Sequence, residues 1–317
     1  MIINILLLVV GFVLLIKGAD IFVDGASSTA QNFKVSKMLI GLTIIAFGTS
    51  APEFAVSMSA LASGSTDMVF GNVVGSCIIN SLLILGIAAV IKPVKVKTNT
   101  VKKELPLCLL FSTALVVLFL DIQLAEGSTN AITRSDGLVI LLFFCVFLYY
   151  LISLTKQKKE LNEEEKPKFK LWKSLLLVAI GLGGIILGSD LVVNNASDIA
   201  KTIGLSERII ALTIIAFGTS LPELVTTIVS AKKGEQDLLI GNIIGSNIFN
   251  ICVVLGIPVV IYGTITPSSF QLIDLIMLIA SAFMLWVFAE TRKTITRLQG
   301  WIMLLAFAIY YVLVFVI

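Results

Sequence analysis

The sequence has 317 residues, of which 57% are hydrophobic and 14% charged, and its mean hydropathy is +1.04. A soluble domain carries about 25% charged residues, so this composition excludes a soluble globular enzyme and indicates an all-α membrane protein. The net charge of +3 is small and scattered, which argues against nucleic-acid binding. The absence of histidine excludes catalytic and zinc sites that depend on imidazole.

Apolar segments long enough to cross a bilayer recur along the chain, since a transmembrane helix needs about 20 mostly apolar residues. We count ten such segments, near residues 2–28, 38–62, 68–91, 105–121, 137–155, 172–200, 208–231, 237–262, 270–290 and 298–316. The two longest, 2–28 and 172–200, exceed a perpendicular span, and we expect them to be strongly tilted. The charged stretch 156–171 is a solvated linker between two halves.

Basic residues gather in alternate loops. The loops after the odd-numbered spans hold 19 of the 23 basic residues, whereas the opposite loops hold only Arg134, Lys201 and Arg208. The positive-inside rule places the first set in the cytoplasm. We therefore expect a multi-pass protein of the cell membrane, with a cytoplasmic linker and both termini extracellular.

The two halves are copies of each other at an offset of 170. Without gaps, 34 of the 81 positions from Gly11 to Ile91 carry the same residue 170 positions later. LTIIAFGTS at 42–50 recurs unchanged at 212–220, with Pro-Glu one residue later in both copies, and GNVVGSCIIN at 71–80 recurs as GNIIGSNIFN at 241–250.

Each copy contains five spans, an odd number, so the second copy enters the membrane inverted relative to the first. The predicted fold is therefore ten transmembrane helices in two inverted five-helix repeats. The first repeat covers 1–155 with its motif at 41–86, and the second covers 172–317 with its motif at 211–256. Inverted repeats are typical of secondary transporters, whose binding site lies at the membrane midplane between the repeats.

Glu53 and Glu223 are the only acidic residues deep within their spans. A carboxylate near the bilayer centre costs several kcal/mol unless it is paired or solvated. No Lys or Arg lies at comparable depth in these spans, so a metal cation is the simplest partner. The alternative is a protonated, hydrogen-bonded glutamate with a structural role.

Oxygen ligands accompany each glutamate at helical spacing. The first copy offers the Ala46 carbonyl, the Thr49 and Ser50 hydroxyls and the Glu53 carboxylate, and the second copy offers the same groups from Ala216, Thr219, Ser220 and Glu223. Pro52 has no N–H, so the carbonyl of Gly48 loses its helical donor. We expect a broken helix here, which membranes tolerate where the backbone lines a cavity.

The second block adds further amide and hydroxyl groups at a spacing of four residues. We interpret Asn72 and Asn242 as interhelical hydrogen-bonding residues, and the candidate cation ligands are Ser76, Asn80, Ser246 and Asn250. An all-oxygen site with two carboxylates suits a hard cation, and flexible coordination by six to eight oxygens favours calcium over magnesium. The cysteines lie in apolar stretches, so we interpret all four as small buried hydrophobic residues: Cys77, Cys108, Cys145 and Cys252.

The motifs GTSAPE with GNVVGSCIIN, and GTSLPE with GNIIGSNIFN, resemble the two α-repeats of the calcium:cation antiporter superfamily, in particular its prokaryotic sodium/calcium exchanger branch. The resemblance covers nearly the whole chain. It implies alternating access in which sodium and calcium compete for overlapping sites, with the first and sixth spans sliding against the core. We expect no cofactor and no obligate protein partner; the expected partners are the transported calcium and sodium ions and the surrounding lipid bilayer.

The resemblance also implies roles for individual residues. Calcium would be held by Glu53 and Glu223 with the carbonyls of Thr49 and Thr219, and Asn80 and Asn250 would complete the centre. The flanking sodium sites would use Ala46, Ser50 and Ser76 on one side, and Ala216, Ser220 and Ser246 on the other.

Asn250 departs from certain archaeal relatives and from the potassium-dependent branch, which carry Asp at this position. The substitution argues against potassium dependence, whereas the GTSxPE motif favours sodium over protons as the driving ion. Three alternatives stay open on the residues alone: an exchanger driven by protons or specific for another divalent cation, a gated cation channel, and an intramembrane enzyme. Channels usually build their filters from symmetric subunits, and no nucleophile–base pair supports the enzyme.

Overall fold

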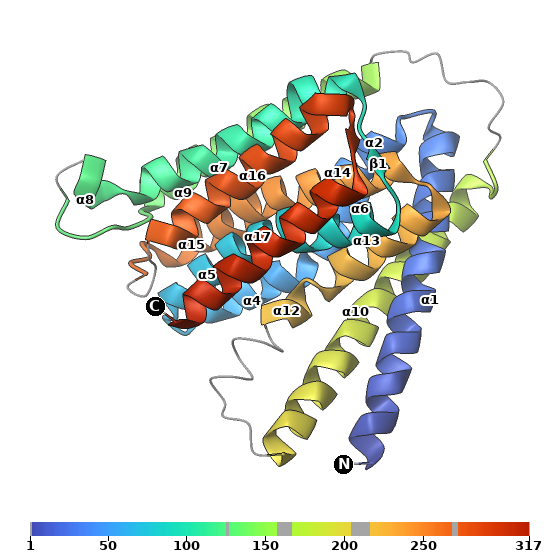
Figure 1. Cartoon of the computed structure of the whole chain (residues 1–317), viewed down its shortest axis with the longest axis horizontal. Coiled ribbons are helices and arrows are strands. Elements are labelled where there is room, and N and C mark those ends of the chain that lie inside the picture. The colour runs from blue at the N-terminus through green and yellow to red at the C-terminus, as the bar shows by residue number, and fades with distance from the viewer. Residues whose placement is uncertain (1, 125–126, 157–166, 204–215, 268–271, 317) are drawn as a thin grey trace. The chain divides into compact units, whose positions relative to one another are not determined.

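Figure 1 shows a computed structural model of the chain, which describes residues 2–124, 127–156, 167–203, 216–267 and 272–316. These residues are almost entirely helical. Seven of their helices are long and apolar enough to cross a membrane, and a bent helix pair between Lys37 and Ala62 provides an eighth candidate span. The prediction of an all-helical membrane protein is confirmed.

The helices of the first repeat are α1 (Ile2–Phe33), α2 (Lys37–Ile40), α3 (Ala46–Thr49), α4 (Ala51–Ala62), α5 (Thr66–Ile78), α6 (Leu85–Ile91), α7 (Leu105–Phe119), α8 (Asp121–Leu124) and α9 (Arg134–Lys156). Wider π-helical turns interrupt them at η1 (Gly41–Ile45), η2 (Ile79–Ile84) and η3 (Thr100–Glu104). The second repeat contains α10 (Leu171–Thr202), α12 (Ala216–Thr219), α13 (Leu221–Lys233), α14 (Gln236–Phe249), η5 (Asn250–Leu255), α15 (Gly256–Tyr262), α16 (Leu272–Arg292) and α17 (Arg297–Val316). The strands β1 (Val94–Lys95) and β2 (Thr294–Ile295) form a short antiparallel pair.

The helix boundaries follow the offset of 170. The short helix α3 ends at Thr49 and α12 ends at Thr219, and α5 begins at Thr66 where α14 begins at Gln236. Two predicted spans lie outside the eight candidates for identifiable reasons. In the segment 105–121, α7 continues directly from η3, but the charged residues Lys102, Lys103 and Glu104 of η3 leave only the 15 residues of α7 as uninterrupted apolar helix. The first part of the segment 208–231 lies outside the described residues.

The chain forms two compact units. The α1–α10 unit consists of Met1–Pro52 with Lys158–Asn242, and the α7–α16 unit consists of Glu53–Gln157 with Ile243–Ile317. The helices α4 and α14 pass from one unit into the other. Each unit therefore contains segments of both repeats.

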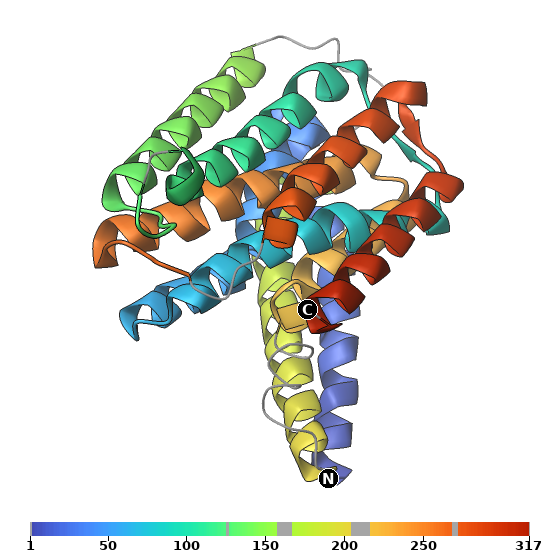
Figure 2. The ribbon, with the colours of Figure 1, turned by 60° about the vertical axis from the view of Figure 1, so that its left-hand side comes forward.

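Within the α1–α10 unit, α1 and α10 lie side by side, as Figures 1 and 2 show, and run in opposite directions. A Cβ added to Gly18 would lie 2.9 Å from the carbonyl oxygen of Gly181, and one added to Gly188 would lie 2.8 Å from that of Gly11. Since Gly181 and Gly188 are the repeat equivalents of Gly11 and Gly18, the pairing is reciprocal. This is the pattern that two inverted copies related by a pseudo-two-fold axis produce.

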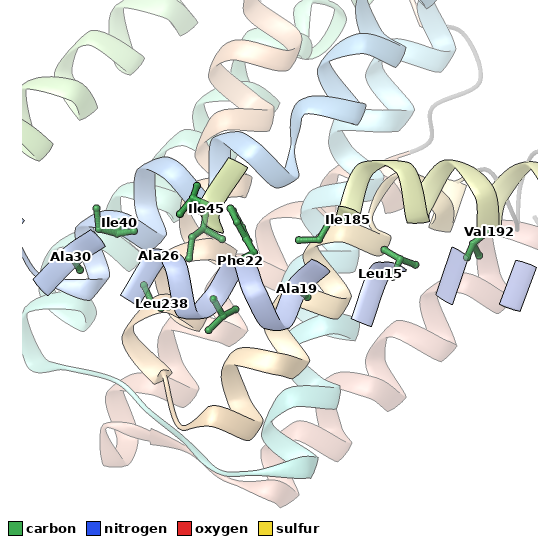
Figure 3. Packing of buried hydrophobic residues seen from close by; sticks show 12 residues of the cluster. Leu15, Ala19, Phe22, Ala26, Ala30, Ile40, Ile45, Ile185, Val192 and Leu238 are labelled. Atoms are coloured by element: carbon green, nitrogen blue, oxygen red, sulfur yellow. The ribbon is translucent and has the colours of Figure 1, made fainter. Parts of the chain in front are cut away.

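Apolar side chains fill the space beside this glycine contact. Figure 3 shows the cluster, in which Leu15, Ala19 and Phe22 of α1 are fully buried and Ile185 of α10 packs beside them. Leu238 joins the cluster from the first part of α14. Close backbone approach and this cluster together hold α1 against α10.

The α7–α16 unit contains the cysteines. Cys77, Cys108 and Cys252 are buried, as predicted, but Cys145 is exposed. Cys145 lies on α9, where Leu142 is also exposed. The prediction for Cys145 is wrong because the outward face of a membrane helix meets lipid, so an apolar residue there need not be buried in protein.

Candidate cation site

The helix that carries the first GTSxPE motif is broken, as the sequence predicts. The segments Lys37–Thr49 and Ala51–Ala62 are bent by 45° relative to each other. The break falls at Ser50, whose backbone angles are φ −86° and ψ 7°. Ser220 of the second copy has nearly the same angles, φ −89° and ψ 5°. Both copies therefore end a short helix after Thr and begin a new one that carries the Pro-Glu pair.

The surroundings of the carbonyl that loses its helical donor to proline differ between the two copies. The carbonyl of Gly218, which Pro222 leaves without its helical donor, accepts a hydrogen bond from Ser189 Oγ of α10 at 3.0 Å. The repeat equivalent of Ser189 is Ala19, which has no hydroxyl. The duplicated motif is thus embedded in surroundings that are not identical.

In the α1–α10 unit the two repeats meet at Glu223. This carboxylate is fully buried in the first turn of α13, and Ser50 Oγ of the first repeat donates a hydrogen bond to its Oε1 at 3.0 Å. Ser50 is also fully buried. The structure therefore brings together two predicted site residues that are 173 positions apart.

Thr49 and Asn242 form a second link in this unit. Thr49 Oγ1 donates to Asn242 Oδ1 at 3.1 Å, and Asn242 Nδ2 donates to Thr227 Oγ1 at 3.4 Å. The Ala46 carbonyl accepts a firm hydrogen bond from the Ser50 N–H at 3.0 Å. Thr49 Oγ1 also lies 3.5 Å from this carbonyl oxygen, at the limit of a hydrogen bond.

Glu53 belongs to the α7–α16 unit, where only 1% of its surface is exposed. Asn72 of α5 holds the backbone of this turn, because its Nδ2 donates to the Glu53 carbonyl at 2.9 Å and to Ser57 Oγ at 2.9 Å. Asn242 contacts Thr227, the equivalent of Ser57, in the same way. The interpretation of Asn72 and Asn242 as interhelical hydrogen-bonding residues is confirmed.

Asn80 and Asn250 lie in the π-helical turns η2 and η5 at equivalent places, and both are buried. Such turns are frequent at functional sites. Among the described residues, Asn80 Oδ1 has no hydrogen-bond partner, and neither do Asn250 Oδ1 and Nδ2. A buried unsatisfied polar atom costs about 1–3 kcal/mol, a cost that a partner bound to these amides would remove.

Asn247 is a buried residue that the sequence reasoning missed. Its Oδ1 accepts a hydrogen bond from Asn80 Nδ2 at 3.1 Å, and its Nδ2 donates to Ser81 Oγ at 2.8 Å. Its backbone carbonyl accepts from Cys77 Sγ at 3.7 Å. Cys77 is the repeat equivalent of Asn247, so this difference between otherwise matched blocks was the available signal.

The predicted site residues are divided between the units. The α1–α10 unit contains Ala46, Thr49, Ser50, Ala216, Thr219, Ser220 and Glu223, and the α7–α16 unit contains Glu53, Ser76, Asn80, Ser246 and Asn250. Ser76 and Ser246 are buried on α5 and α14, whereas the side chain of Ala216 lies outside the described residues. No group of three or more Cys, Asp or Glu side chains in the described part of the chain could hold a metal ion.

Known proteins resemble this chain over its whole length. The model of the family described as "Sodium/calcium exchanger protein" matches residues 3–153 and 173–316. The putative antiporter CaxA of Alkalimonas amylolytica is 40% identical over 99% of both chains, and the sodium/calcium exchanger MaX1 of Methanosarcina acetivorans is 29% identical over 99% of both.

A solved structure has the same fold. The sodium-calcium exchanger NCX_Mj, in a crystal soaked with 10 mM Na+ and zero Ca2+, superimposes with a TM-score of 0.84 at 33% identity and 97% coverage of both chains. This match confirms the predicted exchanger-like fold of inverted repeats. On its sequence, its duplicated motifs and its fold, this chain is a multi-pass membrane protein that belongs to the sodium/calcium exchanger family.

Proposed function

We propose that the chain exchanges sodium for calcium across the cell membrane by alternating access. The observation that carries the proposal is the buried, duplicated GTSxPE motif, in which Ser50 of one repeat donates to Glu223 of the other. Residues from both inverted copies thus contribute to one polar centre, as expected of a secondary transporter. The names of MaX1 and NCX_Mj as sodium/calcium exchangers support the choice of ions.

The calcium ion is held by the carboxylates of Glu53 and Glu223, whose two negative charges one calcium neutralises. The carbonyls of Thr49 and Thr219 and the amide oxygens of Asn80 and Asn250 complete its coordination. Sodium uses the flanking oxygens of Ala46, Ser50, Ser76, Ala216, Ser220 and Ser246. Oxygen-only ligands at flexible distances suit both cations, and the unsatisfied oxygen of Asn80 supports this assignment.

Access changes when α1 and α10 slide together along the rest of the protein. Their mutual contact is made by glycines against backbone, so the two helices form a stiff pair. Apolar residues of α13 pack against the cluster of this pair, namely Leu221, Val225 and Val229. Ion pairs add to this contact, since Lys233 Nζ lies 2.8 Å from Asp20 Oδ1 and 2.6 Å from Asp24 Oδ1. The partly exposed ion pairs contribute about 0–1 kcal/mol each and can break during a transport cycle, and the apolar contacts are not directional, so they can form again after the helices slide.

The charge of the centre sets the expected stoichiometry. With both carboxylates ionised, two sodium ions leave the site neutral and three leave it at about +1. Excess charge in a low-dielectric site costs energy unless ligand dipoles spread it, and the hydroxyl and carbonyl oxygens of two repeats can do so. The resemblance to the sodium/calcium exchangers favours three sodium ions per calcium, which makes the exchange electrogenic. We also assign independence from potassium, because Asn250 adds no charge.

The test is calcium uptake into proteoliposomes that contain the purified chain. An outward sodium gradient should drive uptake, and an outward proton gradient of equal size without sodium should not. The two glutamates could also be discharged by protons, so uptake driven by the pH gradient alone would assign the chain to proton/calcium exchange. Flux far faster than carrier turnover, without dependence on either gradient, would indicate a channel.

A further inference from the structure

Asn80 and Asn250 occupy equivalent places in the repeat, but only one of them is anchored by a second amide. Asn80 donates its Nδ2 to Asn247 Oδ1 at 3.1 Å. The corresponding neighbour of Asn250 in the repeat is Cys77, and among the described residues neither side-chain amide atom of Asn250 has a hydrogen-bond partner. The two halves of the candidate site therefore differ in how firmly they hold their amides.

An asparagine amide can present either its oxygen or its NH2 group, and the hydrogen-bond network decides which. Asn247 is 98% buried, with 2% of its surface exposed, and its own NH2 group donates to Ser81 Oγ at 2.8 Å. Its oxygen is thereby turned toward Asn80. Turning Asn247 over alone would place its NH2 group against the NH2 group of Asn80, which is repulsive.

We propose that Asn247 is a positioning residue that fixes the amide of Asn80 so that Asn80 Oδ1 faces the transported cation. This inference rests on the proposed function. Asn247 touches no cation itself and acts through Asn80, whose NH2 group it occupies. With both amides turned over, Asn80 would present NH2 to the cation, so cation binding and the Asn80–Asn247 hydrogen bond favour the same orientation.

Cys77 of the first repeat occupies the position equivalent to Asn247, beside the unanchored Asn250. At position 77 the side chain is a thiol, and Cys77 Sγ donates to the backbone carbonyl of Asn247. A cysteine can be accommodated at this buried position, but it offers no strong acceptor for a neighbouring NH2 group. The variant Asn247→Cys therefore gives the second repeat the residue of the first.

The experiment measures sodium-driven calcium uptake into proteoliposomes as a function of calcium concentration. Asn247→Cys should raise the half-saturating calcium concentration about fivefold, since one hydrogen bond contributes about 1 kcal/mol and 1.4 kcal/mol is a factor of ten. Its maximal rate should stay within about twofold of the unsubstituted chain. Asn247→Asp keeps an oxygen acceptor for Asn80 and should show a half-saturating concentration at or below the original value.

Asn195→Cys is the matched control, because Asn195 is a buried asparagine on α10 whose Nδ2 donates to Leu191 of its own helix at 2.7 Å. It should leave the calcium dependence unchanged. The inference is overturned if Asn247→Cys raises the half-saturating calcium concentration by less than twofold. It is also overturned if Asn247→Asp raises that concentration as much as Asn247→Cys does.

Failure of the proposed function gives a different result, since the unsubstituted chain would then show no sodium-driven uptake. In that case, or if Asn247→Cys reconstitutes poorly, thermal unfolding in detergent is measured at increasing calcium concentrations for the unsubstituted chain, Asn247→Cys, Asn247→Asp and Asn195→Cys. A calcium concentration for half-protection that rises in Asn247→Cys and not in Asn247→Asp supports the role of Asn247. Equal values for all four proteins contradict it.

Discussion

Adding one methyl group at the contact between α1 and α10 should destabilise the protein measurably. A Cβ on Gly181 would lie 2.5 Å from the Phe22 backbone nitrogen, 2.7 Å from its Cα and 2.8 Å from the Gly18 carbonyl oxygen. All three are backbone atoms, so no rotamer change relieves the clash and the helices must separate. Overpacking of this kind costs about 1–3 kcal/mol.

Gly183 is a matched control two residues away on the same helix. A Cβ there would meet nothing within 4 Å. Both Gly→Ala changes gain about 1 kcal/mol of helix propensity, which cancels in the comparison and leaves the steric cost. Gly181→Ala should therefore unfold roughly 2–5 °C below Gly183→Ala, from the usual scaling of melting temperature with chain length.

The buried thiols provide the assay. Cys77, Cys108 and Cys252 are buried and Cys145 is exposed, so in a Cys145→Ser background a thiol-reactive dye reports unfolding during heating in detergent. Equal melting temperatures for the two alanine variants would refute the close packing of α1 on α10. A lower value for Gly183→Ala than for Gly181→Ala would refute it equally.

Two further predictions concern orientation and charge. In the Cys145→Ser background, Glu164→Cys should resist a membrane-impermeant thiol reagent in intact cells and react after the membrane is opened, because the linker 156–171 is expected in the cytoplasm; ready labelling of intact cells would reverse the topology. With three sodium ions leaving per calcium entering, sodium-driven calcium uptake should accelerate under an inside-positive potential and be unchanged without potassium. Voltage-insensitive uptake would indicate two sodium ions per calcium, and loss of uptake without potassium would contradict the interpretation of Asn250.

The repeat made much of the fold predictable. Identity at an offset of 170 identified the equivalent helices, and Pro52 with Gly48 located the break that the structure places at Ser50. The reciprocal contacts of Gly18 with Gly181 and of Gly11 with Gly188 follow from the same inversion. These features depend on the backbone chemistry of proline and glycine and on the symmetry of the repeat, and both can be recognised in the sequence.

Other features depend on which side chains meet after folding. Asn247 escaped notice because the reasoning relied on positions that the repeats share, and its role arises where they differ. The hydrogen bond from Ser189 to the Gly218 carbonyl was also not predictable from the shared positions, because the equivalent of Ser189 in the first repeat is Ala19. The π-helical turn at Asn80 has no marker residue in the first repeat, whereas Pro258 follows η5 in the second and leaves the Val254 carbonyl without a helical donor.

Sodium-driven calcium uptake by the variants Glu53→Gln and Glu223→Gln tests whether the two buried carboxylates hold the transported calcium. Each substitution keeps the side-chain shape and removes one of the two buried negative charges that are proposed to hold calcium. Size-exclusion chromatography of the purified variants establishes that they are folded. Both variants should lose calcium exchange; folded variants that still exchange calcium at near the original rate would show that these carboxylates do not hold the ion.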